Sequence, residues 1–216
     1  MKLYSYFRSS ASYRVRIALN LKGLPYEVIP IHLLRNGGEQ LTPEYRQLNP
    51  DGLVPTLIEE QSSAVLTQSL AIIEYLEETH PQIPLLPQDA LDRAYVRGIA
   101  MSIACDIHPL NNLRVLRYLV RQLNVSEDEK NAWYRHWCEQ GLAALETMLA
   151  KDKRVGDFCY GNTPSLADCC LIPQIANAQR LNCDLSRMPT LNRINAACLA
   201  LDAFAQSAPS QQPDAE

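Results

Sequence analysis

Three serines stand at the point where a predicted strand, residues 3–7, gives way to a predicted helix. Ser9, Ser10 and Ser12 surround the helix start, where unpaired N–H groups and the positive end of the helix dipole favour an anion. Their hydroxyl groups would add hydrogen-bond donors to such a site. Serines in this position also act as plain N-caps, and Arg8 beside them could simply be solvated. The spacing therefore leaves both an anion site and a structural cap open.

The elements that must position these serines alternate between strands and helices over residues 1–80. Thr42 and Pro43 would cap and begin a short helix, and Pro30 favours the edge of a sheet for the second strand. The order β-α-β-α-β-β-α predicts an α/β thioredoxin-like domain over residues 1–80. After the first strand and helix, the pattern predicts strands at 26–31, 54–58 and 64–67 and helices at 43–48 and 69–79.

The pattern changes at residues 81–88, where three prolines predict a stiff, extended linker. Residues 89–216 are then predicted to form an all-helical domain. Its tail, residues 207–216, is rich in proline, serine and glutamine and is expected to be loose. The predicted helices cover 92–123 with a bend near Pro109, 132–149, 165–181 with Ser165 and Asp168 as a capping box, and 190–206.

Composition argues against several classes of function. The chain has 216 residues, 47% of them hydrophobic, and a net charge of −4 with acids and bases mixed, so no nucleic-acid partner is expected. No apolar run approaches the ~18 residues of a membrane span, so no membrane association is expected. Seven cysteines without a C-x-x-C pair predict a reducing, cytoplasmic compartment.

The motifs of several common catalytic sites are missing. The sequence has no G-x-G-x-x-G, no Walker loop, no G-x-S-x-G elbow and no H-x-x-x-H pair. We therefore predict no nucleotide site and no metal site. If the protein is an enzyme, its nucleophile or cofactor is expected to come from outside the chain.

The serine turn carries a family resemblance. Ser9-Ser10-Ala11-Ser12-Tyr13-Arg14-Val15-Arg16 resembles the Ser-Ser-Cys-Ser-x-Arg-Val-Arg signature of the zeta-class glutathione transferases. Ala11 stands where the family has cysteine, which leaves Ser9 as the candidate thiol activator. Some other transferase classes use an early tyrosine, but we interpret Tyr4 and Tyr6 as packing residues of one strand face. Further matches are Asn49-Pro50 with Val54-Pro55, Gln68 to Leu76, Leu85-Leu86-Pro87, Pro109 to Leu113, Ala167-Asp168 and Pro173-Gln174.

The resemblance covers nearly the whole chain and implies the architecture of a soluble glutathione transferase. It implies an α/β thioredoxin-like, glutathione-binding domain at 1–80, a linker at 81–88 and an all-α substrate-binding domain at 89–216, with glutathione as cofactor and a homodimer as assembly. Cys169 and Cys170 are most simply core residues of a helix.

The resemblance also implies roles in binding glutathione. Ser9 would donate to its sulfur with Ser10 beside it, although both could be plain caps. A cis bond before Pro55 would present the backbone of Val54 to glutathione, whereas a trans proline would only begin an edge strand. The helix start at Gln68 and Ser69 would hold the glutamyl carboxylate, a role compatible with an N-cap.

Three arginines are candidates for binding the substrate, and one histidine is a further candidate for binding glutathione. Arg8 and Arg180 are expected to bind its carboxylates, because guanidinium groups match carboxylates in geometry. Arg114 is a weaker candidate that could lie on a solvated helix face. His108 is a candidate contact to glutathione, although a buried histidine at a bend is the commoner fate.

The implied reaction is a glutathione-dependent cis–trans isomerisation of a maleyl keto acid, maleylacetoacetate or maleylpyruvate, in the breakdown of aromatic compounds. The thiolate would add to the cis double bond, the resulting single bond would rotate, and the thiol would leave to give the fumaryl isomer. Two alternatives stay open. One is a zeta-type transferase acting on small α-halo acids, and the other is a non-catalytic thioredoxin-like binding module.

Overall fold

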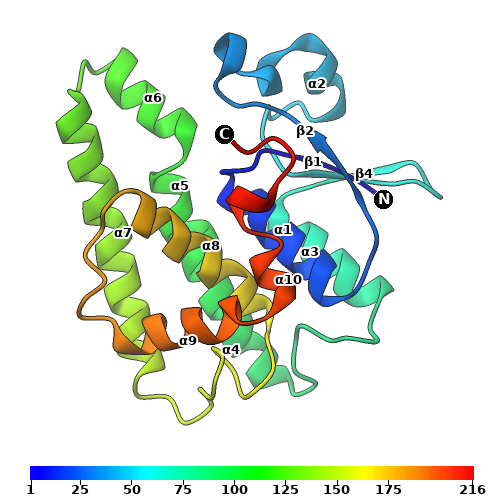
Figure 1. The fold of residues 1–216 in the computed structure, drawn as a ribbon, viewed down its shortest axis with the longest axis vertical. Coiled ribbons are helices and arrows are strands. Elements are labelled where there is room, and N and C mark those ends of the chain that lie inside the picture. The colour runs from blue at the N-terminus through cyan, green and yellow to red at the C-terminus, as the bar shows by residue number, and fades with distance from the viewer. The chain divides into compact units, whose positions relative to one another are not determined.

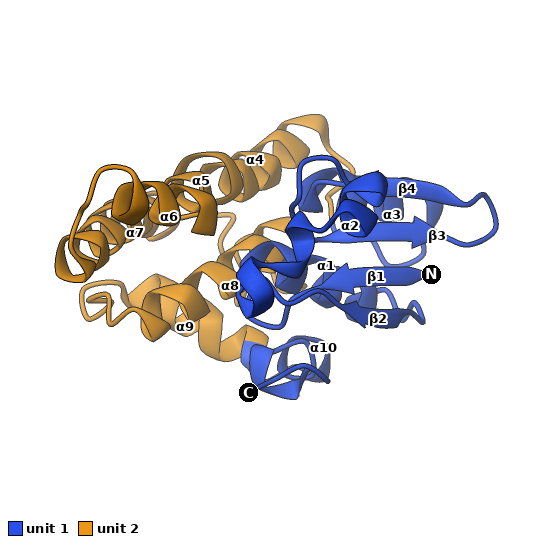
Figure 2. Cartoon of the chain, turned by 90° about the horizontal axis from the view of Figure 1, so that it is seen from above, with its two compact units in different colours: residues 1–85, 199–216 blue, residues 86–198 orange.

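The structure is a computed structural model that describes residues 1–216. It consists of two compact units, one formed by Met1–Leu85 with Leu199–Glu216 and the other by Leu86–Cys198 (Figure 2). The first unit contains the sheet, and the second is built from helices (Figure 1). None of the helices is both long and apolar enough to cross a membrane.

The sheet of the first unit has four strands in the order β2-β1-β3-β4. β1 pairs in parallel with β2 and antiparallel with β3, and β3 pairs antiparallel with β4. Pro30 ends β2 on an edge strand, as predicted, because an edge tolerates a residue without an N–H. The elements are β1 (Lys2–Ser5), β2 (Glu27–Pro30), β3 (Thr56–Glu59), β4 (Ala64–Thr67), α1 (Ser10–Leu21), α2 (Pro43–Leu48), α3 (Ser69–Thr79), α10 (Asp202–Ala205) and short 3-10 turns at Arg35–Gly37, Glu39–Leu41 and Pro209–Gln211.

The core of this unit fixes the ends of the elements that carry the serines. Leu3 and Leu57 pair across β1 and β3, and both are fully buried. Leu19 of α1 and Leu76 of α3 are also fully buried, and these two helices pack against each other. Burial of this apolar area holds the end of β1 and the starts of α1 and α3 in fixed positions.

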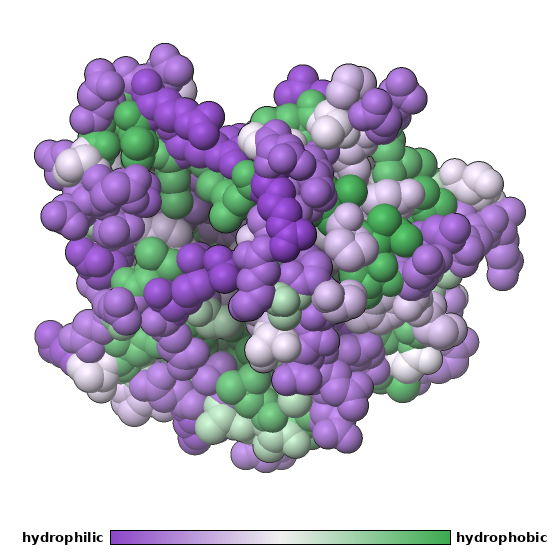
Figure 3. Space-filling model, turned by 45° about the horizontal axis from the view of Figure 1, so that its top comes forward, coloured by the Kyte–Doolittle hydropathy of each residue, from purple (hydrophilic) through white to green (hydrophobic).

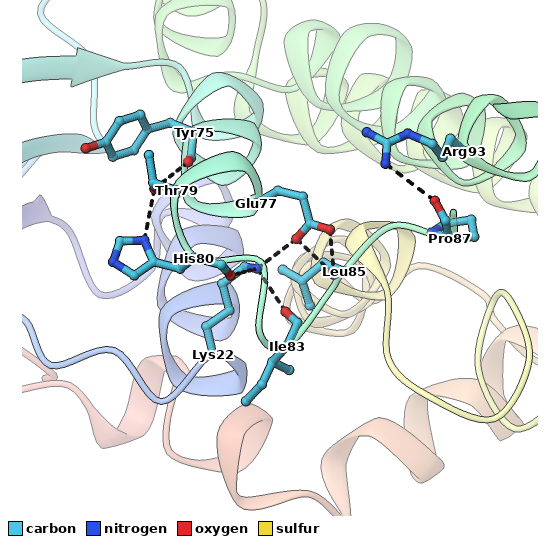
Figure 4. Close-up of polar contacts among 9 residues, drawn as sticks. All are labelled: Lys22, Tyr75, Glu77, Thr79, His80, Ile83, Leu85, Pro87 and Arg93. Atoms are coloured by element: carbon cyan, nitrogen blue, oxygen red, sulfur yellow. Dashed lines mark hydrogen bonds and ion pairs between the residues drawn. The ribbon is translucent and has the colours of Figure 1, made fainter. Parts of the chain in front are cut away.

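A buried ion pair between Lys22, at the end of α1, and Glu77, near the end of α3, also holds the segment that follows α3 (Figure 4). Lys22 Nζ lies 2.7 Å from Glu77 Oε2, and the two side chains are only 1% and 9% exposed. Lys22 Nζ also donates to the carbonyl oxygens of His80 and Ile83, at 3.0 and 2.9 Å. Glu77 accepts the N–H of Leu85 at 3.0 Å. These bonds compensate the cost of removing both charges from water, and they fix the path of the proline-rich segment.

The second unit divides the helical stretch expected at 92–123 into several pieces. A π-helical segment, Ser102–Ile107, follows α4, and the chain turns again before α6. Gly141 of α7 allows this segment to approach closely, because a Cβ there would lie 2.4 Å from Ile107 Cγ1. The helices are α4 (Ala90–Met101), α5 (His108–Leu110), α6 (Leu113–Arg121), α7 (Glu127–Leu149), α8 (Leu166–Arg180) and α9 (Pro189–Leu199).

The C-terminal segment differs from both sequence predictions made for it. The helix expected at 190–206 is broken, since α9 ends at Leu199 and α10 begins at Asp202. The expectation of a loose tail is wrong, because Ser207 is fully buried and the tail belongs to the first unit, where α10 packs against α1. The composition of the tail could not predict its order, because that order depends on contacts with residues far away in the sequence.

The surface of the protein is mostly polar on the face drawn in Figure 3. Hydrophilic side chains cover most of that face, and hydrophobic side chains form smaller separate patches between them. The net charge of −4 is carried by mixed acids and bases.

Candidate functional site

Ser9 is the N-cap of α1 and the most complete candidate of the site. Its backbone N–H donates to Tyr6 O at 2.9 Å and closes the turn between β1 and α1. Its side-chain oxygen accepts the N–H of Ser12 at 3.2 Å. The cap uses the oxygen only as an acceptor, so the hydroxyl proton remains for a ligand. Because the side chain is half-buried at a helix N-terminus, it could stabilise an anion there.

The two neighbouring serines differ from Ser9 in exposure. Ser10 is the first residue of α1 and is 5% exposed, so little of its surface can reach a ligand. Ser12 is fully buried, and its hydroxyl has no hydrogen-bond partner in the protein. Of the three hydroxyls expected beside an anion, that of Ser12 is therefore inaccessible.

The peptide bond between Val54 and Pro55 is cis. The cis geometry implied by the family resemblance is thus present. Val54 lies before Thr56, the first paired residue of β3, so the N–H and C=O of Val54 fall outside the ladder of the sheet. Backbone groups in such a position can pair with an extended peptide as an added strand.

A hydrogen-bond network holds the residues on both sides of the Val54-Pro55 bond in place. Tyr45 on α2 donates its hydroxyl to Leu53 O at 2.6 Å. Asn49 Nδ2 donates to Leu53 O at 2.9 Å and to Thr56 Oγ1 at 3.1 Å. Burial raises the pKa of Tyr45, so its hydroxyl stays protonated as a donor. The Asn49-Pro50 motif therefore serves to fix the backbone next to Val54.

The start of α3 forms a second candidate anion site. Gln68 precedes the helix with φ 68°, a left-handed conformation that costs a non-glycine residue about 1–3 kcal/mol and is common at functional sites. Ser69 begins the helix and is 7% exposed. Its hydroxyl oxygen accepts a hydrogen bond from Arg14 Nη1 at 3.2 Å. Arg14 is 2% exposed, so a buried positive charge lies directly behind the helix N-terminus.

Arg14 was not predicted as a site residue from the sequence. The available signal was two arginines, at 14 and 16, within a helix whose other residues from 15 to 19 are apolar. An arginine in such a position must find buried partners. The structure gives Arg14 the hydroxyl of Ser69 and so connects the two predicted serine sites through α1.

Arg8 lies inside the turn between β1 and α1, whereas Tyr6 begins that turn and Tyr4 lies in β1. Arg8 is exposed, and its guanidinium carbon lies 4.7 Å from the centre of the Phe7 ring. Tyr6 is 4% exposed and packs edge-on against Phe7 and His32. Tyr4 packs against another tyrosine ring. This packing agrees with the interpretation of both tyrosines as structural.

The remaining candidates belong to the second unit and are described there. His108 follows the π-helical segment, is half-buried, and lies 3.4 Å from Asn112 Nδ2 through its Nε2. Arg114 is exposed on α6. π-helical turns are frequent at functional sites, which makes the position of His108 notable.

Arg180 is exposed near the end of α8 and has one polar neighbour there. Its Nη2 lies 3.5 Å from Asn177 Oδ1. Burial raises the pKa of Tyr134. The backbone oxygen of Tyr134 accepts Asn111 Nδ2 at 3.1 Å.

The capping box predicted at the start of α8 positions this helix. The carboxylate of Asp168 accepts both the N–H and the hydroxyl of Ser165, at 2.8 and 2.7 Å, and the N–H of Cys159 at 2.9 Å. Burial raises the pKa of Asp168, while these hydrogen bonds lower it. Cys169 and Cys170 are fully buried, as a core role predicts.

Comparisons with known proteins agree with this geometry. The sequence model described as "Glutathione S-transferase, N-terminal domain" matches residues 3–84. A probable maleylacetoacetate isomerase of Vibrio cholerae is 53% identical over 213 residues, which cover 99% of this chain and 97% of that protein. The holo structure of a maleyl pyruvate isomerase, described as a bacterial glutathione-S-transferase in zeta class, matches with a TM-score of 0.96 and 47% identity over the whole of both chains. A maleylacetoacetate isomerase from Methylobacterium extorquens AM1 with bound malonate and glutathione matches with a TM-score of 0.96 and 41% identity, also over the whole of both chains.

Proposed function

Because this chain belongs to the zeta-class glutathione transferases, the family of the maleylacetoacetate and maleylpyruvate isomerases, we propose that it is a glutathione-dependent cis–trans isomerase. Its substrate is a maleyl keto acid, maleylacetoacetate or maleylpyruvate, and its product is the fumaryl isomer, within the breakdown of aromatic compounds. The observation that carries this proposal is the hydroxyl of Ser9, which is held at the N-terminus of α1 with its proton free to donate.

Ser9 is the residue that would stabilise the reactive sulfur. When bound, glutathione supplies a thiolate that can add reversibly to a cis double bond. A free thiol of this kind has a pKa near ~8.5, so only a few per cent is ionised at pH 7. A hydrogen bond to a charged group is worth about 1.5–3 kcal/mol, which corresponds to roughly 1–2 pKa units. One donated hydrogen bond from Ser9, together with the helix N-terminus, is therefore sufficient to make the thiolate a major species.

The residues of the first unit fit the rest of glutathione. The backbone of Val54 lies outside the sheet ladder and can pair with a peptide backbone. Ser69 and the N–H groups of α3 can hold a carboxylate, and the buried Arg14 behind Ser69 favours that negative charge. The positive φ of Gln68 turns the chain into α3 at this point. These features support a site for a tripeptide with a free carboxylate.

Arginines would hold the substrate and the negative charge that develops on its keto acid group. Arg8 adjoins Ser9 in sequence, and Nη2 of Arg180 lies 3.5 Å from Asn177 Oδ1. Arg114 and His108 are further candidates for contacts. The relative from Methylobacterium extorquens AM1 holds malonate, a small dicarboxylate, together with glutathione, which supports a dicarboxylate substrate for this chain.

The test is to follow both maleyl substrates by ultraviolet absorbance with purified protein, with and without glutathione, while counting free thiols. We expect isomerisation that requires glutathione and leaves the thiol count unchanged. A thiol count that falls in step with substrate would identify a conjugating transferase instead, and turnover of α-halo acids would support that outcome. A protein that fails to bind glutathione in calorimetry would be a non-catalytic module, which would end the proposal.

A cytoplasmic homodimer is also part of the proposal. All seven cysteines are free thiols in the structure, which supports a reducing compartment. The family resemblance supports the dimer. Light scattering of the purified protein tests the dimer, since a monomer at the concentration of the activity assay would contradict it.

A further inference from the structure

The turn that carries Ser9 is held by the other end of the chain. Ser9 N donates to Tyr6 O, so Phe7 and Arg8 are the two central residues of a tight turn. The N–H of Phe7 donates to Asp214 Oδ2 at 3.0 Å. A peptide group that lies two residues before the thiol-site serine is therefore bound by a carboxylate from the C-terminal tail.

The carbonyl of the same residue is held by Arg16. Arg16 is fully buried and donates through Nη2 to Phe7 O at 3.1 Å and through Nη1 to Ser5 Oγ at 3.0 Å. Its Nε donates to Ser207 O at 3.0 Å. Burial lowers the pKa of Arg16 to about 10, so the guanidinium remains charged at neutral pH. Both sides of Phe7 are thus connected to the tail, one directly and one through Arg16.

The tail is itself an ordered element that can hold the turn. Ser207 Oγ donates to Ala203 O at 2.7 Å and accepts Asn20 Nδ2 of α1 at 2.8 Å. Gln212 Nε2 donates to the carbonyl oxygens of Gln206 and Ala208, both at 3.0 Å. These hydrogen bonds join parts of the tail to one another and join the tail to α1. The backbone that carries Asp214 is therefore held in an ordered conformation.

We propose that the C-terminal segment is a positioning element of the thiol site, in which Asp214 holds the Phe7 peptide and thereby sets the positions of the Ser9 hydroxyl and of Arg8. This inference rests on the proposed function and assigns the tail a part in it. Asp214 acts through the turn and touches no substrate, so it is a positioning residue.

The carboxylate of Asp214 holds the Phe7 N–H through one of its oxygens, and its negative charge acts on the buried Arg16. Its other oxygen, Oδ1, is buried and has no hydrogen-bond partner in the protein. An asparagine amide could therefore keep its oxygen on Phe7 N–H, whereas alanine would leave that partly buried N–H without its acceptor. A misplacement of about 1 Å in a positioned catalytic group can cost on the order of a hundredfold in rate.

The experiment compares three variants of the full-length protein in the isomerase assay with saturating glutathione. Asp214→Ala removes the acceptor, and Asp214→Asn keeps it. Glu216→Gln is the matched control, because it neutralises a second, exposed tail carboxylate that pairs with the exposed Arg35 and the buried His32 and forms no hydrogen bond with Phe7. The ionisation of bound glutathione is followed for each variant by the ultraviolet absorbance of the thiolate.

We expect Asp214→Ala to lower kcat by roughly tenfold or more and to raise the pKa of the bound thiol. Asp214→Asn and Glu216→Gln should retain kcat within about twofold and leave that pKa unchanged. Equal losses in Asp214→Ala and Asp214→Asn would overturn the inference, and so would a loss in Asp214→Ala with an unaltered thiol pKa. If the wild type is active and Asp214→Ala is fully active as well, only the role of the tail is refuted. If the wild type is inactive, the proposed function itself is refuted.

Discussion

Replacing Ser9 with alanine should cause two separable losses, because its side chain has two hydrogen-bonding roles. As an acceptor, the hydroxyl oxygen caps α1 through Ser12 N at 3.2 Å. As a donor, its proton is available for the thiolate of glutathione. We therefore expect Ser9→Ala to lower both the stability of the fold and the rate of isomerisation.

The size of each loss follows from the geometry. Removal of a serine N-cap costs about 0.5–2 kcal/mol, typically ~1. For a chain of this size, about 1 kcal/mol lowers the midpoint of thermal unfolding by roughly 2–4 °C. Loss of one preorganised donor to a reacting anion costs about 10²–10³ in rate, and we allow roughly ten- to a thousandfold because Ser10 and the N–H groups of α1 remain.

Two further variants separate these roles. Ser9→Asp keeps the cap, since aspartate is as good an N-cap as serine, but it offers no donor and repels the thiolate. It should retain thermal stability and lose at least as much activity as Ser9→Ala. Ser126→Ala is the matched control, because Ser126 caps α7 in a similar way through Glu129 N at 3.3 Å. It should lower stability by a similar amount and leave turnover unchanged.

Thermal unfolding and the ultraviolet isomerase assay on the same preparations check these expectations. If Ser9→Ala keeps the turnover of the wild type, or if Ser9→Asp recovers it, the donor role assigned to Ser9 is refuted. A rate loss of the same size in Ser126→Ala would show that activity follows stability rather than the thiol site.

Three more predictions concern other parts of the chain. Glu77→Gln should lower the free energy of unfolding in urea by about 3–5 kcal/mol, because it leaves the buried Lys22 without its negatively charged partner. A change below about 1 kcal/mol in this variant would contradict the buried pair. Hydrogen bonds from Arg154 lower the pKa of Asp152 to about 2, so Asp152→Asn should destabilise the protein at pH values above the ordinary aspartate pKa of ~3.9. In acid-unfolding curves, the difference in stability from the wild type should disappear as the pH falls toward 2. A difference in stability that does not depend on pH would count against this pairing. Arg180→Ala should mainly raise KM for the maleyl substrate through loss of carboxylate binding, and unchanged KM and kcat in steady-state kinetics would remove Arg180 from the site.

The parts of the fold that sequence predicts well are those governed by local signals. The helix at Ser69–Thr79 and the strand at Ala64–Thr67 have the predicted bounds, because apolar periodicity and turn residues mark both ends. Thr42 caps α2 through Tyr45 N at 3.3 Å and Pro43 begins it, as their types predict.

Features that depend on distant partners were not predictable in this way. The tail was expected to be loose, but Ser207 is buried beside Arg16, almost two hundred positions away in sequence. The long helix expected at 92–123 is interrupted by a π-helical segment where Ile107 meets Gly141 of another helix. In both cases the deciding contact lies outside the window from which periodicity is read.

The candidate site shows the same division. Ser9 and Ser69 can be located from helix-start signals, and the family resemblance supplies their roles. Arg14 was missed because its value lies in a hydrogen bond to Ser69 across two helices. Asp214 was missed because no local pattern connects it to Phe7. Candidate residues at helix starts were thus easier to locate from the sequence than residues that hold those helix starts in place.

The measurement that tests the central claim most directly is the pKa of the glutathione thiol when bound to this protein, read from thiolate absorbance as a function of pH. The account predicts a value at least about one unit below the ~8.5 of a free thiol in the wild type, and a rise of roughly one to two units in Ser9→Ala. A bound thiol that ionises in the wild type as it does in free solution would contradict it.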